Sequence, residues 1–190
     1  MARAFAILLA ALTLLAGAGH ARAQGFGSRD IMGGDPYFWG GGSSPIPRTL
    51  VSYGSNYAPG TIVISTAERR LYLVLQNGQA LRYGIGVGRD GFRWSGIHRI
   101  SAKKEWPGWT PPSQMLARRP DLPRHMAGGI TNPLGARALY LGSTLYRIHG
   151  SNEPETIGQA VSSGCFRMTN DDVADLYNRV SVGTTVVVKN

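Results

Sequence analysis

The only cysteine of the chain, Cys165, lies sixteen residues after His149. A cysteine thiol becomes an effective nucleophile when a neighbouring histidine lowers its pKa or removes its proton. The same thiol could instead be a small buried apolar side chain, or it could pair with a cysteine of another chain. The two residue types therefore favour catalysis by a cysteine nucleophile, with these two alternatives open.

The residues that flank the two side chains suit this chemistry. Gly164 permits a tight turn before the cysteine, and backbone N–H groups around Ser163 and Gly164 could then point at an oxyanion. Each such donor stabilises a tetrahedral intermediate by about 3 to 4 kcal/mol. No acidic residue adjoins His149, so the backbone carbonyl of Gly150 is a candidate to orient the imidazole.

Metal chemistry is not expected from the sequence. The four histidines are dispersed along the chain, and with one cysteine they lack the spacing of zinc ligands: His20, His98, His125 and His149. We therefore predict that no metal ion is bound.

Residues 1–23 have the pattern of a secretory signal peptide. Arg3 supplies the positive charge, an apolar run follows from Phe5 to Leu15, and Ala21-Arg22-Ala23 resembles a cleavage site. The alternative is an uncleaved membrane anchor, although the apolar run is short for a span. We expect export to the periplasm or cell wall, with no transmembrane anchor after cleavage, because no later segment has roughly 20 consecutive apolar residues.

The chain is basic, with a formal net charge of +9. Residues 1–23 hold two of its twenty Lys and Arg residues and none of its eleven Asp and Glu residues, which leaves +7 on the remainder. This charge suits a polyanionic or carboxylate-rich partner. The basic residues are scattered rather than interleaved with aromatic residues, so we do not expect nucleic acid to be the partner.

Composition divides the remainder into two parts. Residues 24–58 are rich in Gly, Ser and Pro and show neither helical nor strand period, which is typical of a tether. Residues 59–190 are expected to form one mainly β domain. Strands are predicted at 61–65, 70–75, 81–87, 97–103 and 184–188, and one long strand within 136–148 that ends at His149, with a hairpin turn at Asn77-Gly78.

Two helices are predicted in the same part. Apolar residues at helical spacing follow Thr169 and Asn170, either of which is a plausible N-cap, and Gly183 is expected to stop this helix. A shorter helix is predicted at 112–118.

Several motifs in order resemble the L,D-transpeptidase catalytic (YkuD) family, whose pattern is HG[ST] followed by S-x-G-C-[IVF]-R-[ML]. The resemblance extends over about residues 59–190, and the segments that carry it are His149-Gly150-Ser151, Ser162-Ser163-Gly164-Cys165-Phe166-Arg167-Met168, Glu105 to Pro112 and Gly128 to Leu141. It implies a single β-rich, sandwich- or barrel-like domain with short helices.

The resemblance also implies a reaction. Cys165 would attack the carbonyl at position three of a peptidoglycan tetrapeptide stem, release D-alanine and form a thioester. The acceptor would be the amine of a second stem, giving a 3→3 cross-link, or an amine of an outer-membrane protein. Water as acceptor would make the protein an L,D-carboxypeptidase, and a wall-binding module without activity is a further alternative. The family needs no metal or organic cofactor.

By position, Cys165 and His149 match the family nucleophile and base, Gly150 the residue that orients the base, and Ser163 and Gly164 the oxyanion backbone. Arg167 matches an arginine that holds a substrate carboxylate or the loop, with the loop role slightly favoured. Substrate-binding roles are also implied for Asn132 and Trp109, around the cleft. The chain departs from the pattern at Ser163, where many members have histidine.

Overall fold

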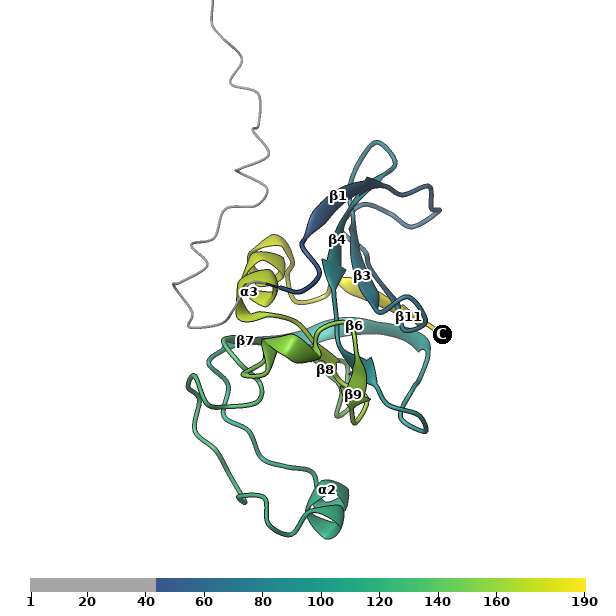
Figure 1. Cartoon of the computed structure of the whole chain (residues 1–190). Helices are drawn as coiled ribbons and strands as arrows, with labels where there is room; N and C mark the ends of the chain where they lie inside the picture. Colours follow the sequence, from purple (N-terminus) through teal and green to yellow (C-terminus); the bar gives the residue numbers. More distant parts are fainter. Residues whose placement is uncertain (1–43) are drawn as a thin grey trace, which may run out of the picture. The chain divides into compact units, whose positions relative to one another are not determined.

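The structure is a computed structural model that describes residues 44–190 (Figure 1). Its strands are β1 (Thr49–Ser52), β2 (Ile62–Ser65), β3 (Arg70–Val74), β4 (Gln79–Gly84), β5 (Val87–Gly88), β6 (Gly96–Glu105), β7 (Arg137–Leu141), β8 (Arg147–His149), β9 (Ala160–Ser162), β10 (Phe166–Arg167) and β11 (Thr185–Lys189). Its helices are α2 (Ser113–Arg118), the 3-10 turn η1 (Pro154–Thr156) and α3 (Asn170–Arg179). The predicted signal segment and residues 24–43 lie outside the described residues.

One sheet dominates the fold, with strand order β1-β4-β3-β2-β11-β6-β7-β8-β10. The last strand, β11, lies in its middle, parallel to β2 and antiparallel to β6. Val186, Val187 and Val188 are buried there, as is expected of a β-branched run with neighbours on both sides. The prediction of a mainly β domain with short helices is confirmed.

The β3–β4 hairpin forms where the sequence predicts it. Asn77 and Gly78 have φ angles of 58° and 65°, and two consecutive positive φ angles are the signature of a tight hairpin turn. Leu71 and Tyr83 face each other across this hairpin and are fully buried.

The long strand predicted within residues 136–148 is wrong, because the chain turns back on itself at this point. β7 and β8 are separate antiparallel strands joined by a turn that contains Gly142, which has a φ of 56°. The Thr144 hydroxyl stabilises the turn by donating to Leu141 O at 2.7 Å. As a consequence, His149 lies on a short strand beside β10 rather than at the end of a long one.

A strand was not expected in residues 24–58, yet β1 pairs with β4 in antiparallel register. Before it, the buried Arg48 guanidinium lies 3.4 Å from Asp172 and 3.3 Å from Asp175, which are both on α3. β1 is an edge strand that is mostly exposed, so it has no apolar alternation to reveal it in the sequence. Ordered structure therefore begins before residue 59.

Helix α3 begins as predicted, with Thr169 as N-cap accepting from the Asp172 N–H at 3.3 Å. Val173 and Leu176 are buried, and the helix packs on β7 and β8. It ends at Arg179, before the predicted stop at Gly183, because the chain is already extended at Val180.

The predicted helix near 112–118 is α2, which lies within a long excursion between β6 and β7, away from the sheet (Figure 1). None of its residues is buried. Paired Trp109 and Met126 close the neck of this excursion. No helix among residues 44–190 is long and apolar enough to cross a membrane.

Candidate active site

The parallel pairing of β8 with β10 brings the predicted catalytic residues together. Ile148 lies opposite Phe166, and both are buried. Because side chains alternate along a strand, His149 and its partner Arg167 point to the other face. Extending this register by one residue places Cys165 beside Arg147 on the same face.

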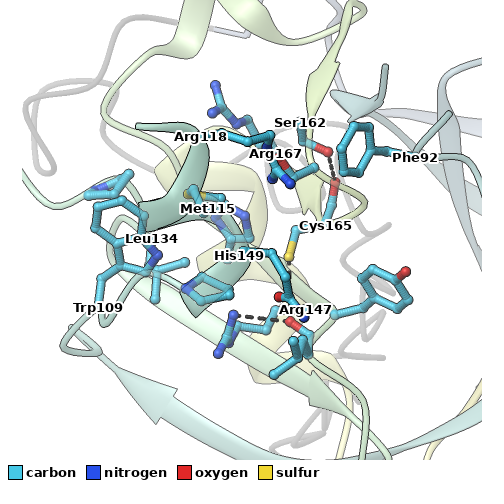
Figure 2. Close-up of a pocket in the computed structure, with 16 residues that line it drawn as sticks. Phe92, Trp109, Met115, Arg118, Leu134, Arg147, His149, Ser162, Cys165 and Arg167 are labelled. Carbon is cyan, nitrogen blue, oxygen red and sulfur yellow. Dashed lines mark hydrogen bonds between the residues drawn. The ribbon is translucent and has the colours of Figure 1, made fainter. Parts of the chain in front are cut away.

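These four side chains line one cavity of about 450 Å³, shown in Figure 2. His149 and Arg147 enter it from β8, Cys165 from the residue just before β10, and Arg167 from β10 itself. The excursion between β6 and β7 supplies much of the apolar lining, including Trp109, Pro112, Met115, Pro133 and Leu134. The cleft therefore combines a thiol, an imidazole and two guanidinium groups with an apolar wall.

His149 is oriented by its own neighbour. Its Nδ1 lies 2.6 Å from Gly150 O, so Nδ1–H donates to this carbonyl and Nε2 remains as the acceptor. Burial, opposed by the Gly150 carbonyl and aided by the charges of Arg167 and Arg147, lowers the pKa of His149 to about 3. The imidazole is therefore neutral at neutral pH, with a lone pair available to take a proton.

Gly150 has no room for a side chain. A Cβ there would collide with Oδ1 of Asn170, and this oxygen accepts from the Ala136 N–H at 2.9 Å. The first residue of α3 thus ties the start of β7 to the end of β8. This packing holds the carbonyl that orients His149.

The thiol of Cys165 is also mostly uncharged in the resting site. Its hydrogen-bond partner is Leu145 O at 3.8 Å. Burial raises the pKa of Cys165, while the positive charge and hydrogen bonds of Arg147 lower it. A neutral thiol and a neutral imidazole in one cleft are the starting state that general-base catalysis requires, in which the proton moves as the sulfur attacks.

Arg147 was not singled out from the sequence. The signal that could have revealed it is its position two residues before His149, which puts both on one face of a strand. Its Nη1 donates to Leu145 O at 3.1 Å. Arg147 is the cation best placed to stabilise a thiolate at Cys165.

The turn before the nucleophile is braced by Ser162. Its hydroxyl donates to Cys165 O at 2.6 Å and accepts from the Gly164 N–H at 3.1 Å. The Gly164 N–H is thus engaged within the turn, so its predicted oxyanion role requires this bond to be exchanged. Ser163, the other predicted contributor, is held from outside by Arg89, whose Nη1 lies 3.2 Å from the Ser163 hydroxyl.

Two stacked aromatic rings support the same turn from behind. Trp94 and Tyr146 stack with centroids 4.5 Å apart, and Trp94 Nε1 donates to Gly164 O at 2.8 Å. Gly164 has a φ of 108°, and a Cβ there would press on the Tyr146 ring. Glycine is therefore required here by both its conformation and its surroundings.

Arg167 is positioned as part of the loop. Its Nη1 lies 2.7 Å from a carboxylate oxygen of Glu153 and 3.4 Å from the Thr156 hydroxyl. Its backbone N–H and C=O pair with Gly86. The charge still faces the cleft, but the guanidinium is held by the segment around η1.

The remaining two predicted substrate-binding residues differ in placement. Trp109 lines the cleft. Asn132 does not: it is fully buried, donates to Ala127 O at 2.8 Å and accepts from the Leu134 N–H at 2.9 Å. Its side chain holds the base of the excursion.

No group of three or more His, Cys, Asp or Glu side chains within residues 44–190 is arranged to hold a metal ion.

Known proteins share this domain. A family model described as "L,D-transpeptidase catalytic domain" matches residues 59–188. The chain is 37% identical over 136 residues to the Escherichia coli K12 protein described as "Probable L,D-transpeptidase ErfK/SrfK", covering 67% of this chain and 43% of the relative. It therefore spans less than half the length of that curated relative.

Solved structures support the fold. L,D-transpeptidase 3 from Mycobacterium tuberculosis superposes with a TM-score of 0.56 at 16% identity, covering 68% of this chain and 60% of that one. A Brucella melitensis structure described as a "Probable carnitine operon oxidoreductase" is 47% identical with a TM-score of 0.52, covering 77% of this chain and 96% of that one. That description applies to the Brucella protein, whereas the family model and the E. coli relative are both described as transpeptidases. On the match over residues 59–188, this chain belongs to the L,D-transpeptidase catalytic domain (YkuD) family.

Proposed function

We propose that the protein is an exported L,D-transpeptidase that acts on peptidoglycan stem peptides through a cysteine acyl-enzyme. The observation that carries this proposal is the cleft in which Cys165 and His149 meet, with Nδ1 of the imidazole held by Gly150 O at 2.6 Å. This arrangement leaves Nε2 to accept the thiol proton. Family membership supports the same assignment.

In the first step, Cys165 Sγ bonds to the carbonyl carbon at position three of a tetrapeptide stem while Nε2 of His149 takes the thiol proton. The tetrahedral intermediate then collapses. The bond to the D-alanine nitrogen breaks, and this nitrogen receives the proton from His149. A thioester on Cys165 and free D-alanine result.

In the second step, an amine attacks the thioester and His149 removes a proton from the amine. The C–S bond breaks, and the sulfur leaves as a thiolate that regains the proton. Arg147 stabilises the sulfur while it carries negative charge. An amine from a second stem gives a 3→3 cross-link, an amine of an outer-membrane protein gives a protein anchor, and water gives a tripeptide.

The test uses protein that lacks residues 1–23, incubated with tetrapeptide-rich sacculi and analysed by mass spectrometry of the muropeptides. New 3→3 dimers that are absent with Cys165→Ala would establish transpeptidation. Tripeptides without dimers would identify water as acceptor, and a protein adduct would identify the protein amine. Sacculus binding that survives Cys165→Ala, with unchanged muropeptides from both proteins, would contradict an enzyme and favour a binding module.

A further inference from the structure

Arg118, which lines the active-site cavity, and Arg89, which lines the cavity beside it, have no carboxylate partner among the described residues. Within residues 44–190, neither Arg89 nor Arg118 forms an ion pair. Arg119, the next residue after Arg118, is by contrast paired with Asp121 at 2.7 Å. The two unpaired charges are therefore available to an anion.

The same two arginines converge on one aromatic ring. The guanidinium carbon of Arg89 lies 4.3 Å from the centroid of Phe92, and that of Arg118 lies 5.3 Å from it. Arg89 follows β5, whereas Arg118 is the last residue of α2. Two like charges beside one ring repel each other, and an anion in the cavity that both arginines line relieves this repulsion.

This pair lies next to the nucleophile. Arg89 contacts the Ser163 hydroxyl at 3.2 Å, and Phe92 and Arg118 line the cavity that contains Cys165. A second cavity, of about 710 Å³, adjoins the first and is lined by Arg89, Arg118 and Ser163. In Figure 2, Arg118 is drawn on the opposite side of the thiol from Arg147.

The donor peptide carries an anion close to the bond that the thiol attacks. Its C-terminal carboxylate is three bonds from the carbonyl carbon that the sulfur attacks, which corresponds to about 4 Å. The other cations of the site are already engaged, since Arg167 is held by Glu153 and Arg147 faces the thiol. Arg89 and Arg118 are the pair left to receive this carboxylate.

We propose that Arg89 and Arg118 form a carboxylate-binding subsite for the C-terminus of the donor peptide. The inference rests on the proposed function and specifies how that site selects its bond. Because Arg89 and Arg118 would bind a free C-terminal carboxylate, the amide that the thiol attacks is the last one of the peptide. Peptides that continue past this residue lack the carboxylate and are disfavoured.

The experiment compares two tetrapeptide donors that differ only in a C-terminal carboxylate or carboxamide. Acyl-enzyme formation is followed by the intact mass of the protein. We expect the wild-type protein to react with the carboxylate donor at least about tenfold faster, which is the contribution of one charge-assisted hydrogen bond. Arg118→Gln should lower the rate with the carboxylate donor about tenfold and leave the carboxamide rate unchanged, whereas Arg89→Gln, which also releases Ser163, should lower the carboxylate rate more than the carboxamide rate.

Arg93→Gln is the matched control, because it removes the same charge four residues after Arg89, lines neither cavity and should leave both rates unchanged. Equal rates of the wild-type protein with the two donors would overturn the subsite alone. An equal loss with both donors in Arg118→Gln would also overturn it, since that result describes a structural role. Failure of the wild-type protein to react with either donor would contradict the proposed function and, with it, the subsite.

Discussion

At the scale of single residues, the reactivity of Cys165 depends on a balance between burial and Arg147. Burial raises the pKa of the thiol, and Arg147 lowers it. We expect Arg147→Gln to raise this pKa further. Alkylation by iodoacetamide at pH 7 should slow about tenfold for each unit by which the thiol pKa rises. The pH profile of alkylation measures the effect, with the exposed Arg93→Gln as control. An unchanged profile would exclude Arg147 as the thiolate-stabilising group.

His149 makes a second prediction because it is buried without charge. Its pKa falls from 6.5 to about 3 on folding, so between these pH values the unfolded chain binds a proton that the folded protein does not bind. The free energy of unfolding should therefore decrease as pH falls from about 6.5 towards 3, by several kcal/mol. Urea unfolding of the wild-type protein and His149→Gln across this range isolates the contribution. Parallel pH dependence of the two proteins would contradict it.

The sequence analysis identified Cys165 and His149 because their residue types carry the chemistry by themselves. It did not identify Arg147, Arg89 or Arg118, because arginine is common on protein surfaces and its role depends on the groups that the fold places opposite it. The register of β8 with β10 gives Arg147 its place beside the thiol. Arg89 and Arg118 belong to segments far apart in the chain, and both pack against the ring of Phe92.

At the scale of elements, the first turn of α3 contains a buried carboxyl group, that of Asp172. Burial raises the pKa of Asp172 to about 6, although Arg48 lowers it. The folded protein therefore binds a proton more tightly than the unfolded chain, and this group reduces stability as pH rises from about 4 to about 6. We expect Asp172→Asn to remove this decline in the free energy of unfolding, which amounts to at most about 3 kcal/mol, in urea unfolding measured between about pH 4 and 6. A decline that persists in Asp172→Asn would assign it to other groups.

Elements with strong local signals were predicted, and those that depend on distant contacts were not. The Asn77-Gly78 turn and the Thr169 cap are encoded within a few residues, and both formed as expected. β1 exists through its pairing with β4 and through Arg48, which no local pattern reveals. The β7–β8 turn was missed because apolar residues continue on both sides of Gly142.

At the scale of the whole molecule, the positive charge has a measurable consequence. If the carboxylates of the wall attract the protein, binding of Cys165→Ala to sacculi should weaken strongly between about 50 mM and about 500 mM salt, because screening shortens the range of exposed charges. Pelleting with isolated sacculi measures this binding. Retention that is independent of salt would instead indicate recognition by shape or apolar contact.

The position of β11 determines when the domain can complete its folding. Until residues 185–189 are available, β2 and β6 each have an unpaired edge, and the two halves of the sheet remain apart. A chain that is still being made or threaded through a membrane pore therefore cannot close its main sheet. For a protein proposed to be exported, the two halves of the main sheet can therefore join only after residues 185–189 have crossed.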